Sequence, residues 1–261
     1  MSAGLDKKIS LKSIIAFTLP TMSTMVFLSL YTIVDGVFIS RYVGANALSA
    51  TNIVYPVINL VLGTSIMMST GGSAIVAMLL GEKKEKRARS IFTSLTIVVF
   101  CIGILISILG NLFIKDIIYL AGSTKELYSD CYDYLSFTLY FVPIAILKTY
   151  FDYFLVTAGK PELGLLSGII GGITNMVLDY IFIVPLRLGV KGAALATQMG
   201  MVIPVLIALS YFVYFSRKRG VLYFEKPIFQ FRTIIKACAN GSSEMVTQIS
   251  TGITTYLFNI K

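Results

Sequence analysis

Two aspartates, Asp35 and Asp179, lie inside long apolar runs of the sequence, where a charged side chain is costly. Asn175 precedes Asp179 by four residues, so a helix would present both side chains on one face. Thr197 lies in the next apolar run and adds a hydroxyl oxygen. Two carboxylates, an amide oxygen and a hydroxyl in a low-dielectric pocket suit a proton or Na⁺. These residues are the candidate cation site, with H⁺ or Na⁺ as the ion and no other cofactor.

The depths of the two aspartates are similar. Asp35 lies six residues before Arg41, and Asp179 lies eight residues before Arg187. At a rise of 1.5 Å per residue, the aspartates lie about 9 Å and about 12 Å below those basic side chains. The same count places Thr197 at about 9 Å. We therefore expect oxygens from three helices to meet. The alternative is that both aspartates only hydrogen-bond neighbouring helices and stabilise the bundle.

The elements that position these side chains are membrane spans. Of the 261 residues, 56% are hydrophobic and 13% are charged, against about 25% charged in a soluble domain. This composition excludes a water-soluble domain, and the absence of histidine excludes His-based zinc sites and His general bases. The net charge of +9 comes from basic residues between apolar runs. That distribution indicates membrane topology and affinity for anionic lipid headgroups, not nucleic-acid binding.

The fold class predicted from these runs is all-α: a polytopic six-helix transmembrane bundle followed by a truncated seventh helix. A span needs about 20 mostly apolar residues, and backbone in lipid must be helical. The seventh helix begins near Ile235, is rich in Ser and Thr, and reaches Lys261, where the sequence stops. The six predicted spans cover residues 13–40, 42–81, 90–114, 127–156, 163–186 and 192–216.

Loop charges predict the orientation. With the N-terminus in the cytoplasm, fifteen Lys and Arg residues fall on the inner side and five on the outer side. Inner loops normally carry this excess, so we expect a cytoplasmic N-terminus. The predicted division is an N-terminal six-helix bundle at residues 1–219, a cytoplasmic linker between bundles at residues 220–234, and the start of a second bundle at residues 235–261.

A second charged feature lies in the predicted fourth span. Lys148 and Asp152 are four residues apart, so we expect a buried ion pair on one helix face. The alternative is a role in gating or in substrate contact.

Three stretches together resemble a known family. They are residues 33–50 (IVDGVFISRYVGANALSA), the Gly-Lys-Pro turn at 159–161, and residues 174–182 (TNMVLDYIF) followed by 189–197 (GVKGAALAT). In order, spacing and helix placement they are similar to the multidrug and toxic compound extrusion (MATE) transporters. The resemblance covers essentially the whole chain.

The resemblance implies roles for particular residues. It assigns Asp35, Asn175, Asp179 and Thr197 to the cation site of the N-terminal bundle, with Na⁺ as one candidate ion. Tyr31 matches a residue beside that site. Pro20 matches a first-helix proline implicated in bending, and proline independently removes a helical hydrogen bond.

The resemblance also implies an architecture and a function. MATE proteins have twelve helices in two six-helix bundles with the drug path between them. We therefore expect this chain to be a fragment that requires a second, C-terminal bundle. The implied function is cation-coupled (H⁺ or Na⁺) multidrug efflux by alternating access in the bacterial cytoplasmic membrane, with small amphipathic, cationic substrates.

Three alternatives remain open. A lipid-linked saccharide flippase of the same superfamily tends to line its cavity with several basic residues, whereas Lys148 is the one basic residue at mid-membrane here. An intramembrane aspartyl protease needs motifs around a Gly-Asp pair, which neither Asp35 nor Asp179 displays, so we do not expect an enzyme. A non-transporting scaffold would show no effect on dye accumulation. The same oxygens serve H⁺ and Na⁺, so the sequence does not distinguish the two ions.

Overall fold

The computed structural model describes residues 11–259, which are helical apart from the connecting segments. A π-helical turn (Ile39–Val43) continues the first helix, and another (Tyr211–Phe215) continues the eighth. The all-α fold class is thereby confirmed. The α-helices are α1 (Leu11–Phe38), α2 (Ala45–Gly81), α3 (Glu85–Leu112), α4 (Ile114–Leu120), α5 (Tyr128–Tyr140), α6 (Val142–Thr157), α7 (Pro161–Ile183), α8 (Gly189–Ser210), α9 (Ser216–Arg219) and α10 (Phe231–Asn259).

Several of these helices are long and apolar enough to cross a membrane. Within residues 11–259, α2, α3, α7 and α8 with its continuation to Lys218 meet that test individually. Helices α5 and α6 meet it together as one bent span. The Ser- and Thr-rich α10 does not enter this count, nor does α1, whose side chains are described only in part. A polytopic helical membrane protein was therefore predicted correctly.

The predicted fourth span is wrong in one respect, because it is not a single helix. Helix α5 ends at Tyr140 and α6 begins at Val142, with an angle of 57° between them. Pro143 lies in the first turn of α6. A proline there has no N–H to donate to the preceding turn, which ends α5 and allows α6 to start in a new direction.

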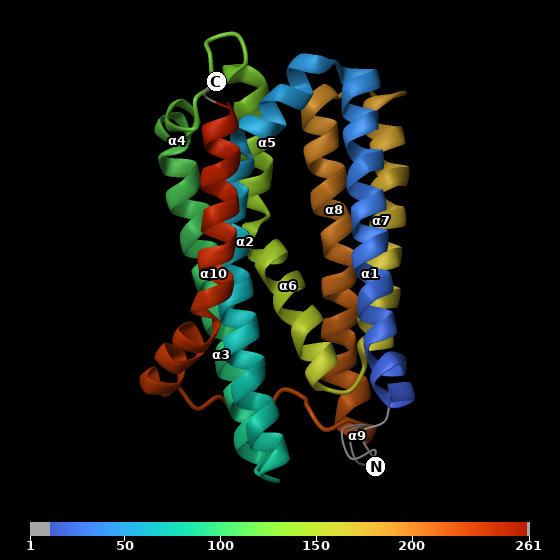
Figure 1. The fold of residues 1–261 in the computed structure, drawn as a ribbon, viewed down its shortest axis with the longest axis vertical. Helices are drawn as coiled ribbons and strands as arrows, with labels where there is room; N and C mark the ends of the chain where they lie inside the picture. Colours follow the sequence, from blue (N-terminus) through green and yellow to red (C-terminus); the bar gives the residue numbers. More distant parts are fainter. Residues whose placement is uncertain (1–10, 260–261) are drawn as a thin grey trace.

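The helices form two groups joined by α6. Helices α1, α7 and α8 stand side by side on one side of the molecule, and α2, α3 and α10 stand on the other (Figure 1). Helix α6 runs obliquely between them and packs on α2, α3, α7 and α8. One face of α6 is thus directed to each group.

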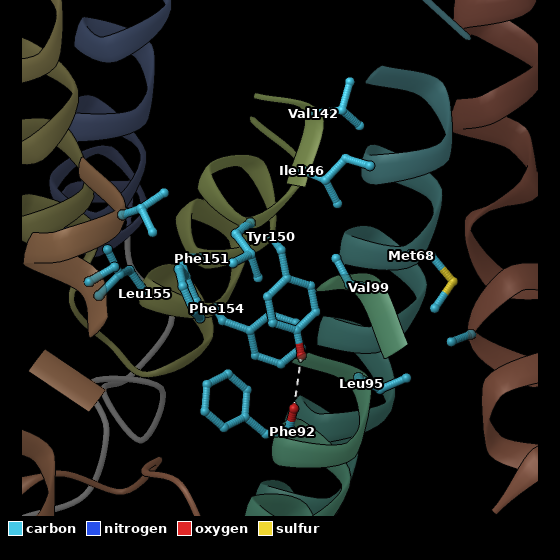
Figure 2. Packing of buried hydrophobic residues seen from close by; sticks show 14 of the residues in the cluster. Met68, Phe92, Leu95, Val99, Val142, Ile146, Tyr150, Phe151, Phe154 and Leu155 are labelled. Carbon is cyan, nitrogen blue, oxygen red and sulfur yellow. Dashed lines mark hydrogen bonds between the residues drawn. The ribbon is translucent and has the colours of Figure 1, made fainter. Parts of the chain in front are cut away.

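The contact between α6 and α3 is an aromatic core (Figure 2). The Phe92 ring on α3 lies 5.0 Å from the Phe154 ring and 6.1 Å from the Tyr150 ring, centroid to centroid. All three side chains are fully buried, and the Tyr150 hydroxyl donates a hydrogen bond of 3.1 Å to the Phe92 carbonyl. Between helices in lipid, such aromatic contacts stabilise through close packing rather than through removal of apolar surface from water. This core fixes the rotation of α6 about its own axis.

Helices α7 and α8 approach each other through glycines. A Cβ on Gly171 would lie 2.6 Å from the Gly200 carbonyl oxygen, and a Cβ on Gly200 would lie 2.9 Å from the Asn175 Cβ. No larger residue leaves this spacing unchanged, because real Cβ atoms essentially never come this close to other atoms. The crossing brings the backbone of α8 against Asn175.

The segment between α9 and α10 is extended and is attached to the start of α3. The Arg89 Nε donates to the Val221 carbonyl at 2.8 Å, and the Glu225 and Ile228 amides donate to the hydroxyls of Thr93 and Ser94 at 3.0 and 2.8 Å. Helix α10 begins at Phe231, earlier than the predicted start near residue 235, and packs along α2. The division into two bundles and a linker stays a prediction.

Candidate cation site

The two membrane aspartates lie in contact with each other. Asp35 is near the end of α1 and Asp179 near the end of α7, and these helices pack together. The two carboxyl groups lie near enough to interact electrostatically, and Asp179 is fully buried. A hydrogen bond between two carboxyl groups requires a proton on one of them. As carboxylates, Asp35 leaves Oδ1 and Asp179 leaves both oxygens without a donor.

Asn175 lies one helical turn before Asp179 and beside its carboxyl group. Its side chain is 2% exposed, and neither Nδ2 nor Oδ1 has a hydrogen-bond partner of good geometry. Buried polar groups normally find partners, since leaving one unpaired costs about 1–3 kcal/mol. Unpaired oxygens from both aspartates and from Asn175 therefore converge on one place. Such a set suits a proton or a hard cation that prefers oxygen ligands.

Thr197 joins this cluster from α8. Its hydroxyl donates to the Ala193 carbonyl at 3.0 Å, which leaves the oxygen lone pairs available. Thr197 lines a cavity of about 200 Å³ together with Asp35, and a smaller pocket of about 50 Å³ together with Asn175. It thus borders both spaces, the larger lined by Asp35 and the smaller by Asn175.

Gln198 is a neighbour that sequence reasoning missed. It is 3% exposed, its Oε1 has no partner, and it lines the 200 Å³ cavity with Asp35. The available signal was a polar side chain inside an uncharged span. Gln198 was not predicted because consecutive residues on a helix point in directions about 100° apart. Thr197 and Gln198 were therefore not both expected to face the cavity.

The remaining predicted residues have different outcomes. Tyr31 and Pro20 lie within the α1 helix, but their side chains are outside the part of the structure that is described. Lys148 and Asp152 form the predicted ion pair, with 2.8 Å between Nζ and Oδ2. The pair is less buried than predicted, since the Lys148 side chain is 18% exposed and the Asp152 side chain 34%.

The 200 Å³ cavity has a mostly apolar wall with a few polar groups. Asp35, Thr138, Thr197 and Gln198 supply these polar groups, and apolar and tyrosine side chains from α2, α5, α6 and α8 form the rest. Drug-sized ligands usually occupy about 300–1,000 Å³. A compound of that size would need the cavity to widen or to open toward another part of the protein.

Comparisons with known proteins agree with one family. The sequence profile of the MatE family matches residues 20–181. The chain is 23% identical over 221 residues to the probable multidrug resistance protein YoeA of Bacillus subtilis, covering 83% of this chain and 47% of that protein. It is 27% identical over 218 residues to the multidrug export protein MepA of Staphylococcus haemolyticus, covering 82% of this chain and 46% of that protein.

The fold agrees as well. A crystal structure of MATE in the bent conformation superimposes with a TM-score of 0.83 at 24% identity, covering 93% of this chain and 54% of the other. The chain spans about half the length of the curated relatives it matches.

Proposed function

The chain belongs to the MatE family, and from this premise we propose that it is the N-terminal part of a multidrug efflux antiporter coupled to H⁺ or Na⁺. The observation that carries the proposal is the contact between the Asp35 and Asp179 carboxyl groups from two different helices. Two adjacent carboxylates in a low-dielectric setting repel each other, and a proton or cation between them relieves that repulsion.

Coupling requires that ion binding favour one conformation over another. An ion with equal affinity for two conformations shifts nothing, so the aspartates must be close in one state and apart or hydrated in the other. Asp35 lies on α1, which packs chiefly on α7, so a movement of α1 changes the distance to Asp179. Pro20 within α1 is the proposed bending point, because proline weakens the helix there.

The proposed substrates are small, amphipathic, cationic compounds. Asp35 supplies negative charge on the wall of a cavity that is otherwise mostly apolar. A C-terminal bundle is expected to complete the substrate path, and membrane lipids surround both. The excess of basic residues in the predicted inner loops supports a cytoplasmic N-terminus, and the proposed location is the bacterial cytoplasmic membrane.

A lipid-linked saccharide flippase is less well supported. Recognition of phosphate groups in a membrane cavity calls for basic side chains. Among the described residues that line the two spaces beside the aspartates, Lys148 alone is basic, and it is already paired with Asp152.

The proposal is tested with Asp35→Asn and Asp179→Asn in the full-length product of the gene that encodes this chain. Each amide removes one ionisable group while keeping the side-chain shape. We expect both variants to reach the membrane folded but to lose efflux driven by an imposed pH or sodium gradient in proteoliposomes. The matched control is Asp116→Asn on α4, an exposed aspartate, which should behave as wild type. Unchanged gradient-driven efflux in either site variant would refute the proposal.

A further inference from the structure

An apolar groove lies on the other side of the wall of the 200 Å³ cavity. It has a volume of about 430 Å³ and is formed mainly by α2 and α3. Among the described residues that line it, Thr64 alone is polar. Leu60, Leu109 and Phe113 on its lining are exposed, so the groove is open to the surroundings of the bundle. An exposed apolar groove on two membrane spans suits lipid chains or the apolar part of a ligand.

The groove and the cavity share a wall. Within the described part of the chain, three residues line both spaces: Val57 and Val61 from α2, and Leu139 from α5. A side chain that borders two spaces is the whole thickness of the wall between them. Valine is stiff at χ1 in a helix, so the two valines form a fixed side of this wall. Leu139 is the side chain that can move.

The position of Leu139 is tied to the bend between α5 and α6. Leu139 lies in the last turn of α5, directly before the 57° bend, and it is 2% exposed. It packs against Gly110 of α3, where an added Cβ would lie 2.6 Å from the Leu139 Cδ2. Pro143 follows the bend and packs against Gly103, one face and two turns away on α3. A change of the bend angle therefore moves Leu139 relative to its seat on Gly110.

The two spaces complement each other in charge and in size. Asp35 lines the same cavity as the three wall residues, whereas the groove is apolar. The cavity of about 200 Å³ is smaller than the roughly 300–1,000 Å³ that drug-sized ligands occupy, and the groove of about 430 Å³ lies within that range. A compound that occupies both spaces would place a cationic head in the cavity with Asp35 and an apolar chain in the groove.

We propose that Val57, Val61 and Leu139 form a side gate, through which the apolar chain of an amphipathic cation passes between the membrane and the cavity. The gate is closed in this structure, because the three side chains separate the two spaces. It opens when Leu139 leaves its seat on Gly110, and the cavity and the groove then become one space. This inference rests on the proposed function and adds to it a route and a substrate shape, a cationic head with a long apolar chain.

The test compares two cations with the same head, butyltrimethylammonium and decyltrimethylammonium. Their KM values are measured for efflux from proteoliposomes that contain the full-length gene product. Val61→Phe narrows the gate, so we expect the ratio of the decyl KM to the butyl KM to rise about tenfold. Leu139→Ala removes the movable side chain and should lower that ratio, because the open gate then no longer has to displace it. The ion concentration for half-maximal efflux, K0.5, is measured with the butyl cation in each variant.

The matched control is Ile58→Phe, also on α2. Ile58 lines the cavity but not the groove, so its replacement should change the two KM values alike and leave their ratio at the wild-type value. A raised ratio in Val61→Phe alone supports the gate. An unchanged ratio in Val61→Phe, or an equal rise in Ile58→Phe, would overturn it. A change of K0.5 as large as the change of the ratio would also overturn it, because the effect would then lie at the ion site.

A second variant tests what occupies the groove. Leu109→Asn places a polar group on the groove lining away from the gate, so it should raise the decyl KM and leave the butyl KM unchanged. If another part of the full-length protein fills the groove, Leu109→Asn will lower the unfolding temperature without changing the ratio, which would overturn the inference. If Val61→Phe does not fold, Val61→Leu replaces it, and Leu139→Ala must still lower the ratio. Wild-type protein that expels neither cation would refute the proposed function instead.

Discussion

The close crossing of α7 and α8 gives a test of how tightly Asn175 must be held. In Gly200→Ala, the new Cβ would lie 2.9 Å from the Asn175 Cβ and 2.9 Å from the Gly171 carbonyl oxygen. Ordinary contacts begin near 3.4 Å. Neither obstacle is the end of a flexible side chain, so the two helices must separate by about 0.5 Å at this level.

The magnitude follows from that displacement. Overpacking by one methyl group costs about 1–3 kcal/mol, part of which is offset by the better helix propensity of alanine. A misplacement of about 1 Å in a functional site can cost about a hundredfold, so half of that distance at Asn175 should cost about tenfold in ion affinity. We expect K0.5 for the coupling ion to rise about tenfold and the maximal efflux rate to change less.

The control lies on the other helix of the crossing, away from the contact. A Cβ on Gly164 of α7 meets nothing within 4 Å, so Gly164→Ala should be neutral or stabilise the protein by about 0.5–1 kcal/mol. Efflux assays at varied ion concentration and thermal unfolding in detergent are run on both variants. A wild-type K0.5 in Gly200→Ala, despite a lower unfolding temperature, would show that Asn175 does not need its position against α8.

Two further predictions concern the packing that supports the site. Tyr150→Phe removes the hydrogen bond to the Phe92 carbonyl while keeping the ring, so thermal unfolding should show a loss of about 0.5–1.5 kcal/mol with efflux retained; an unchanged unfolding temperature would contradict the assigned hydrogen bond. Arg89→Ala removes the charge-assisted contact to Val221, so limited proteolysis should cleave residues 220–230 several-fold faster. Lys86→Ala, at an exposed position of α3, should leave that rate unchanged. Equal rates in both variants would show that Arg89 does not hold this segment against α3.

The helical membrane fold was predictable because lipid leaves the backbone no other solution than closed hydrogen bonding within each span. The bend between α5 and α6 was not predicted. Pro143 produces it, yet Pro56 and Pro204 lie inside helices that continue through them. A proline therefore marks a weak point, and whether the helix breaks there depends on packing that sequence alone does not describe.

The candidate site shows a similar division. The similar depths of Asp35 and Asp179 in the membrane allowed us to predict that they are neighbours. Depth can be calculated from the number of residues along a span. The pocket shared by Lys148, Asn175 and Thr197 was not predicted, because it depends on the rotation of α6. That rotation is set by the contact of Tyr150 with α3, between residues far apart in the sequence.

Asp35 has a position that links the two halves of the proposed exchange. It contacts Asp179 on one side and lines the 200 Å³ cavity on the other. Under the proposed function, an ion shared by the aspartates would remove negative charge from the cavity wall, and a cationic substrate in the cavity would compete for the same carboxylate. Competition of the coupling ion and the substrate for one carboxylate suits an antiporter, because neither cation then binds well while the other is present. Efflux substrates should accordingly raise K0.5 for the coupling ion, whereas neutral compounds of the same size should not.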